Sequence, residues 1–179
     1  LAKNEKIFYA ALFSQLVLGL GFGFLSMYLC LKINYKFWRR FSFLIFLGSI
    51  LLTASVFVPS LGWSHGGAER WIQLGPISFQ PVEFLKFAFV IYLAAVLSSA
   101  KNRVKDFRFG ILPFLIMIAI IAFILFKQPD TKSFILITIT GISMLFISSV
   151  PVRYILGALF GAVLLLGTLV YFKPYLQER

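Results

Sequence analysis

Acidic residues, histidine and cysteine are scarce in this sequence of 179 residues. It holds six Asp and Glu residues together, one histidine and one cysteine. The single cysteine, Cys30, excludes an intrachain disulfide, and His65 without a second His or Cys argues against a zinc site. Neither a G-x-S-x-G nucleophile motif nor a phosphate-binding P-loop is present. An enzyme built on this chain must therefore work with its few carboxylates and its cations.

Charge is low overall and uneven in sign. Only 13% of the residues are charged and 60% are hydrophobic, whereas a soluble domain is about a quarter charged. The 17 Lys and Arg residues give a net charge of +11. They cluster in short loops between apolar runs, so a membrane explains them better than nucleic acid does. We therefore expect an all-α integral membrane protein with about six transmembrane helices.

The apolar runs and the basic loops predict the topology. A single polytopic membrane domain over 1–179 is expected, with helices at 7–31, 41–60, 80–98, 109–126, 133–152 and 154–172. The loops at 32–40 and 100–108 are strongly basic, so the positive-inside rule places both in the cytoplasm. Alternation puts the loop at 60–79 and the amino terminus outside. An outside start requires a preceding helix, so we expect a partial chain.

Polar groups collect on the predicted outer side. Glu83 and Lys86 are spaced i, i+3 and share one helix face. Because a charge inside the membrane costs about 3 kcal/mol, they either neutralise each other or face a polar cavity. Arg70 either pairs with Glu69 or faces the same cavity. Asp130 either caps the following helix or contributes to that cavity.

Carboxylates and cations at a membrane face suit more than one function. Sugar transfer from a polyprenyl diphosphate needs a carboxylate that deprotonates the acceptor hydroxyl and cations for the departing diphosphate. A transporter uses the same residue types to bind and release its cargo. In the last span, Gly157 and Gly161 form a GxxxG pattern, which predicts close helix packing inside the bundle or at a dimer face.

Several segments resemble those of the SEDS family (shape, elongation, division and sporulation). The run GGAERWIQLGPISFQPVEFLK at 66–86 is similar to the family's G-A-x-R-W-I motif followed by Q-P-S-E-x-x-K. The run Gln128-Pro129-Asp130 resembles its Q-P-D-x-G motif. The stretch at 32–40 resembles the first cytoplasmic loop of the family, and the stretch at 173–179 resembles the start of its large outer loop.

This resemblance implies a ten-helix fold, of which the chain supplies the second through the seventh helices. It implies an inverting peptidoglycan glycosyltransferase that polymerises lipid II during cell division or cell-wall elongation, as a multi-pass protein of the bacterial inner (plasma) membrane. The form of the motifs is nearest the division member. The implied partners are lipid II, a class B penicillin-binding protein transpeptidase, other division or elongation proteins and the lipid bilayer, without nucleic acid. A lipid-linked precursor transporter (flippase) and a non-catalytic scaffold stay open as alternatives.

The resemblance also carries roles to matching positions. The catalytic candidates are Asp130 and Glu83. The substrate-binding candidates are Arg70, Lys86, Trp71, Gln80 and Pro81. No cofactor is implied beyond a candidate divalent cation, Mg or Mn, held at Glu83 or Asp130.

Three features depart from the family pattern. Val82 stands where the family has serine, which removes a hydroxyl beside Glu83. Thr131 and Lys132 replace the usual Leu-Gly, and Lys132 is close enough in sequence to pair with Asp130. The presumed catalytic aspartate of the family lies in the large outer loop, and this sequence ends where that loop begins. We therefore expect either a fragment or a shortened relative.

Overall fold

The computed structural model describes residues 14–58, 62–65, 68–74 and 77–172, with one residue, Gln80, joining the last strand to a helix. The chain forms two compact units, Leu1–Arg40 and Phe41–Arg179. The first unit contains a π-helical segment, Ser14–Gly21, followed by α2 (Phe22–Lys32). Residues 7–13 of the first expected span lie outside the described residues. No described residue of α2 is buried.

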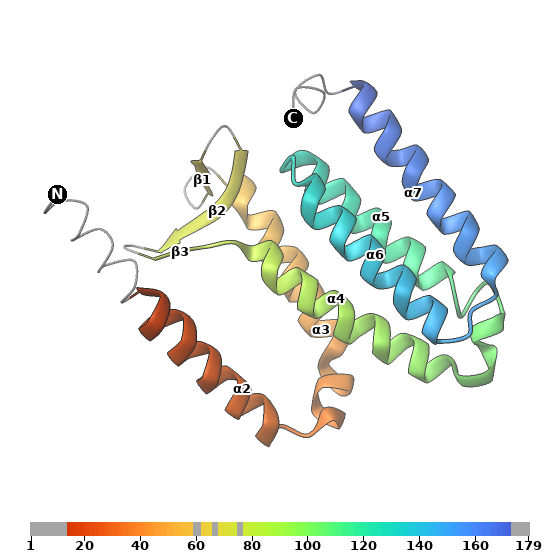
Figure 1. Cartoon of the computed structure of the whole chain (residues 1–179), viewed down its shortest axis with the longest axis horizontal. Coiled ribbons are helices and arrows are strands. Elements are labelled where there is room, and N and C mark those ends of the chain that lie inside the picture. Colours follow the sequence, from red (N-terminus) through yellow and green to blue (C-terminus); the bar gives the residue numbers. More distant parts are fainter. Residues whose placement is uncertain (1–13, 59–61, 66–67, 75–76, 173–179) are drawn as a thin grey trace, which may run out of the picture. The chain divides into compact units, whose positions relative to one another are not determined.

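Five helices make up most of the second unit (Figure 1). Their bounds are α3 (Tyr35–Ala54, which begins in the first unit), α4 (Pro81–Ala100), α5 (Leu112–Lys127), α6 (Thr131–Ile147) and α7 (Val152–Phe172). Two helical segments, Tyr35–Phe57 and Pro81–Lys105, are long and apolar enough to cross a membrane by length and composition. Pro81 begins α4, because its missing N–H needs no partner in the first turn.

The core of the second unit forms where α4, α5 and α6 meet. One row of α4 side chains is buried at helical spacing: Val82, Leu85, Phe89, Leu93 and Leu97. Gly141 of α6 faces Phe89 and Phe114, and a Cβ atom added there would lie 2.8 Å from Cζ of Phe89. Real Cβ atoms do not approach so closely. The missing side chain therefore lets α6 approach the two phenylalanines.

A small antiparallel sheet occupies the expected outer loop. Its strands are β1 (Gly62–His65), β2 (Ala68–Leu74) and β3 (Ile77–Phe79), paired in the order β1-β2-β3. Residues 60–79 were expected to form a loop, so these strands were not predicted. Phe79 packs edge-on against Phe84 of α4, with ring centroids 6.1 Å apart. The sheet is thereby held at the start of α4.

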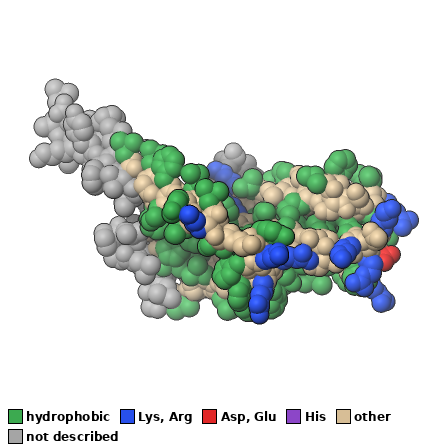
Figure 2. All heavy atoms as spheres, turned by 90° about the horizontal axis from the view of Figure 1, so that it is seen from below, with side chains coloured by type: hydrophobic (Ala, Val, Ile, Leu, Met, Phe, Trp, Pro, Cys, Tyr) green, Lys and Arg blue, Asp and Glu red, His purple; other side chains and the backbone are tan. Residues whose placement is uncertain are grey.

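Segments predicted to share one side of the membrane lie together in the second unit. Phe107, which follows η3 (Lys101–Lys105), packs edge-on against Tyr154 at the start of α7. At the other end of the helices, the α5–α6 turn contacts β2 and α3. In Figure 2, Lys and Arg side chains gather at the right-hand end, where η3 and the start of α7 lie in Figure 1.

Candidate functional site

The turn between α5 and α6 is the centre of the candidate site. It consists of Gln128, Pro129 and Asp130, and Asp130 is the N-cap of α6. One carboxylate oxygen accepts the Ser133 backbone N–H at 3.3 Å, and the other accepts the Gln80 amide at 3.4 Å. The side chain of Asp130 is 4% exposed. The helix-capping interpretation of Asp130 is therefore confirmed, and the long bond from Gln80 shows that the residue before α4 lies next to the cap.

Arg70 reaches this turn from β2. Its Nε donates to the Gln128 carbonyl at 3.0 Å, and one terminal nitrogen donates to the Pro129 carbonyl. Both acceptors are neutral, so these bonds fix the guanidinium in place without cancelling its charge. They use two of its five N–H donors. In the described part of the chain, Arg70 is thus an anchored cation with donors to spare.

Gln128 was not among the predicted site residues, yet it joins the site to α3. Its side-chain amide donates to the Thr53 carbonyl at 2.7 Å, and both residues are buried. The Thr53 hydroxyl in turn donates to the Ser49 carbonyl at 2.7 Å. A polar residue near the outer end of an otherwise apolar run, such as Thr53 in LLTASVF, is the sequence signal that points to this contact.

Glu83 and Lys86 form an ion pair, which is one of the two alternatives that their spacing left open. The Lys86 ammonium lies 2.7 Å from the Glu83 carboxylate, with the Glu83 side chain 55% exposed and the Lys86 side chain 23% exposed. The Glu83 backbone N–H donates to the Gln80 carbonyl at 3.1 Å, and the Gln80 side-chain amide donates to Asp130. Gln80 therefore connects Glu83 to the Asp130 cap. Val82 is buried in the core, on a different face from Glu83. The serine-to-valine departure therefore changes core packing rather than the surroundings of Glu83.

The remaining predicted residues are placed less closely to the turn. Trp71 follows Arg70 on β2, so its side chain leaves the opposite face of the strand. Pro81 is buried as the first residue of α4.

Among the described residues, Asp130 is bonded to Ser133 and Gln80, and the pairing with Lys132 that the sequence allows is not formed. No group of three or more His, Cys, Asp or Glu side chains occurs in the described ranges, so the divalent cation has no ready ligand set there.

The hydrogen bonds thus join the three motif segments R-W-I, Q-P-V-E and Q-P-D, although about 50 residues or more separate the bonded partners. A family model described as "Cell cycle protein" and covering FtsW, RodA and SpoVE matches residues 2–179. The chain belongs to the FtsW/RodA/SpoVE family. The predicted resemblance to SEDS proteins is confirmed, and so is the all-α membrane fold class.

Curated FtsW/RodA/SpoVE relatives carry the name of the division member. The chain is 34% identical over 160 residues to "Probable peptidoglycan glycosyltransferase FtsW" of Geobacter sulfurreducens, covering 89% of this chain and 42% of the relative. It is 30% identical to the protein of the same name from Legionella pneumophila, covering 88% and 40%. The chain therefore spans about 40% of the length of these relatives.

Solved structures of the family are also similar to this chain over part of their length. A chain from a peptidoglycan synthase complex that coordinates polymerization and crosslinking is similar with a TM-score of 0.73 and 29% identity, over 90% of this chain and 47% of that one. The rod shape determining protein RodA of Thermus thermophilus is similar with a TM-score of 0.66 and 27% identity, over 83% and 48%. The FtsW/RodA/SpoVE fold thus extends well beyond the segment described.

Proposed function

We propose that the protein containing this chain is a peptidoglycan glycosyltransferase that polymerises lipid II into glycan strands. The observation that carries the proposal is the anchored cation Arg70, whose charge is not neutralised by its two carbonyl partners. The departing group of this reaction is a diphosphate, and preorganised cations stabilise the charge that it gains. The names of the relatives, which call them probable peptidoglycan glycosyltransferases, support the same reaction.

The roles of the other residues follow from their positions. Lys86 is a further cation near the start of α4, and its ammonium is paired with the Glu83 carboxylate at 2.7 Å. Because α4 packs against both α6 and β2, the elements that carry Arg70 and Lys86 are in contact with each other. Transfer also needs a carboxylate that takes the proton of the acceptor hydroxyl. Asp130 and Glu83 are the candidates within the chain, and one of them would also hold a divalent cation if the reaction uses one.

We also propose where the reaction takes place and which protein works with this enzyme. We place the site at the outer face of the bacterial plasma membrane, because the basic loops at 32–40 and 100–108 belong inside. The partner we propose is a class B penicillin-binding protein transpeptidase, which crosslinks the new strands. A chain of a peptidoglycan synthase complex that coordinates polymerization and crosslinking is a structural neighbour, which supports such a partner.

The test is glycan synthesis from fluorescent lipid II by the complete protein with its transpeptidase. Arg70→Gln is expected to lower the rate about 10²-fold, the loss typical of removing one preorganised donor. Arg108→Gln, the same change at the opposite end of the helices, is the matched control and should leave the rate unchanged. A near-normal rate in the folded Arg70→Gln variant would refute the proposed role. Lipid II flipping in liposomes without polymerisation would favour a transporter instead.

A further inference from the structure

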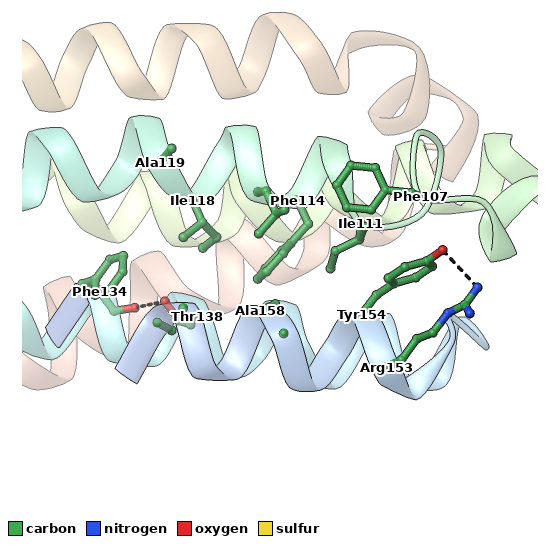
Figure 3. A pocket seen from close by; sticks show the side chains of 14 residues that line it. Phe107, Ile111, Phe114, Ile118, Ala119, Phe134, Thr138, Arg153, Tyr154 and Ala158 are labelled. Atoms are coloured by element: carbon green, nitrogen blue, oxygen red, sulfur yellow. Dashed lines mark hydrogen bonds between the residues drawn. The ribbon is translucent and has the colours of Figure 1, made fainter. Parts of the chain in front are cut away.

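An apolar groove runs between α5, α6 and α7 in the second unit (Figure 3). It has a volume of about 380 Å³. Ile111, the N-cap of α5, and Phe114 and Ile118 within α5 form one wall. The other wall is α7, where Gly157 and Gly161 stand in the lining. We refer to it as the α5–α7 groove.

Two glycines keep the α5–α7 groove open. A Cβ atom added at Gly157 or Gly161 would meet no other atom within 4 Å in the described structure. The close packing inside the bundle that the GxxxG pattern predicts is therefore not formed among the described residues. Ala158 and Ala162, also in the lining, are small as well. This stretch of α7 leaves room for an occupant.

A cation stands at one end of the α5–α7 groove. The Arg153 guanidinium lies over the Tyr154 ring, 4.8 Å from its centroid, and donates to the Tyr154 hydroxyl at 3.2 Å. Both contacts are to a neutral side chain, and Arg153 is exposed. In the part of the chain that the structure describes, Arg153 has no carboxylate partner. Its charge is therefore available to an anion at the groove mouth.

The surroundings of the mouth are also basic. The Tyr154 ring packs edge-on against Phe107, 5.7 Å between centroids, in the loop that follows η3. That loop region carries Lys101, Arg103, Lys105 and Arg108 against one acid, Asp106. The end of the helices at which the groove opens thus carries an excess of positive charge. This combination is complementary to a molecule with an apolar tail and an anionic head.

The length of the α5–α7 groove matches one leaflet. Its α7 wall runs from Arg153 to Ala162, nine residues on, which at 1.5 Å per residue is about 14 Å. The hydrocarbon core of a bilayer is about 30 Å thick, so the groove reaches about to its middle. A lipid acyl chain lying along it would begin at the membrane surface and end where the opposite leaflet begins.

We propose that the α5–α7 groove binds an anionic glycerophospholipid, with one acyl chain against Gly157 and Gly161 and the phosphate at Arg153. Basic pockets between transmembrane helices bind lipid head groups in this way. The lipid comes from the leaflet on the η3 side. The site is distinct from the Arg70 site, which lies at the opposite end of the same helices. The proposal therefore stands apart from the proposed glycosyl transfer.

The test measures lipid binding to the complete purified protein by native mass spectrometry in detergent. The probes are phosphatidylglycerol and phosphatidylcholine with identical acyl chains. Gly161→Leu fills the groove and is expected to weaken phosphatidylglycerol binding by at least about tenfold, because excluding two methylene groups already has that effect. Gly167→Leu is the matched control on the same helix, since Gly167 has open space around it but does not line the groove.

The head-group part of the proposal has its own variant. Arg153→Gln is expected to reduce the preference for phosphatidylglycerol over phosphatidylcholine about fivefold, the usual effect of one cation near an anionic lipid. Lys127→Gln, which removes a cation at the opposite end of α5 and outside the groove lining, should keep the preference. An unchanged preference in Arg153→Gln would overturn the head-group assignment.

Two other outcomes would overturn the groove assignment. Equal losses of binding in Gly161→Leu and Gly167→Leu would show that the lipid binds elsewhere. If another helix of the longer protein or a second copy fills the groove, Gly161→Leu would lower the unfolding temperature and leave phosphatidylglycerol binding as in the parent. The measured unfolding temperature of each variant separates these cases from a failure to fold.

Discussion

Substitutions of Asp130 can distinguish a structural role of this residue from a catalytic one. Its carboxylate caps α6 through Ser133 and accepts a long bond from Gln80. Losing an N-cap costs about 1 kcal/mol, and the 3.4 Å bond adds little because it lies beyond the usual distance range. We therefore expect Asp130→Ala to lower the free energy of unfolding by about 1–2 kcal/mol. Asparagine keeps an acceptor oxygen, so Asp130→Asn should cost only about 0.5 kcal/mol, mainly through the lost charge at the helix start.

Two measurements on the complete protein check this ordering. Unfolding in mixed micelles gives the stabilities, with Asp106→Ala, an exposed acid at the opposite end, as the control. Lipid II polymerisation by the stable Asp130→Asn variant then isolates the charge, and we expect that variant to be folded and inactive. Full activity in Asp130→Asn would remove Asp130 from the catalytic candidates. An Asp130→Ala variant as stable as the parent would refute the capping argument itself.

Two further substitutions test the packing described above. Gly141→Ala should lower the unfolding free energy by about 1–3 kcal/mol, because the added methyl group overlaps Phe89. The control is Gly48→Ala, which has open space around it and should be neutral or slightly stabilising. Equal effects of the two changes would contradict the close approach of α6. Gln128→Leu should cost about 1–3 kcal/mol, since it leaves the buried Thr53 carbonyl without its amide partner; an unfolding curve that matches the parent would show that this bond contributes nothing.

Local sequence signals predicted the features that depend on near neighbours in the chain. The i, i+3 spacing of Glu83 and Lys86 gave their ion pair as one of two alternatives, and the structure contains it. The position of Asp130 before an apolar run gave its cap as one of two alternatives, and this contact is also formed. Each of these contacts lies within one helical turn, so the sequence alone contains the relevant geometry.

Contacts between distant segments could not be predicted in the same way. The bond from Gln128 to Thr53 spans 75 residues and depends on how α3 and α5 pack. The short strands at 62–79 also escaped prediction, because WIQLGPISF mixes apolar and polar residues without a long alternating run. The GxxxG pattern at Gly157 is a case in which a local motif predicted close helix packing, but no described residue packs against this glycine.

The anchors of Arg70 have a consequence for how this protein tolerates sequence change. Both acceptors are main-chain carbonyls, of Gln128 and Pro129, and every residue type supplies a carbonyl. Substitution at either position leaves the arginine its acceptors as long as the turn keeps its path. The position of the guanidinium therefore depends on the path of the turn, which the buried bond from Gln128 to Thr53 helps to hold. Change at Arg70 itself has no such latitude, because only arginine combines a fixed charge with this forked set of donors.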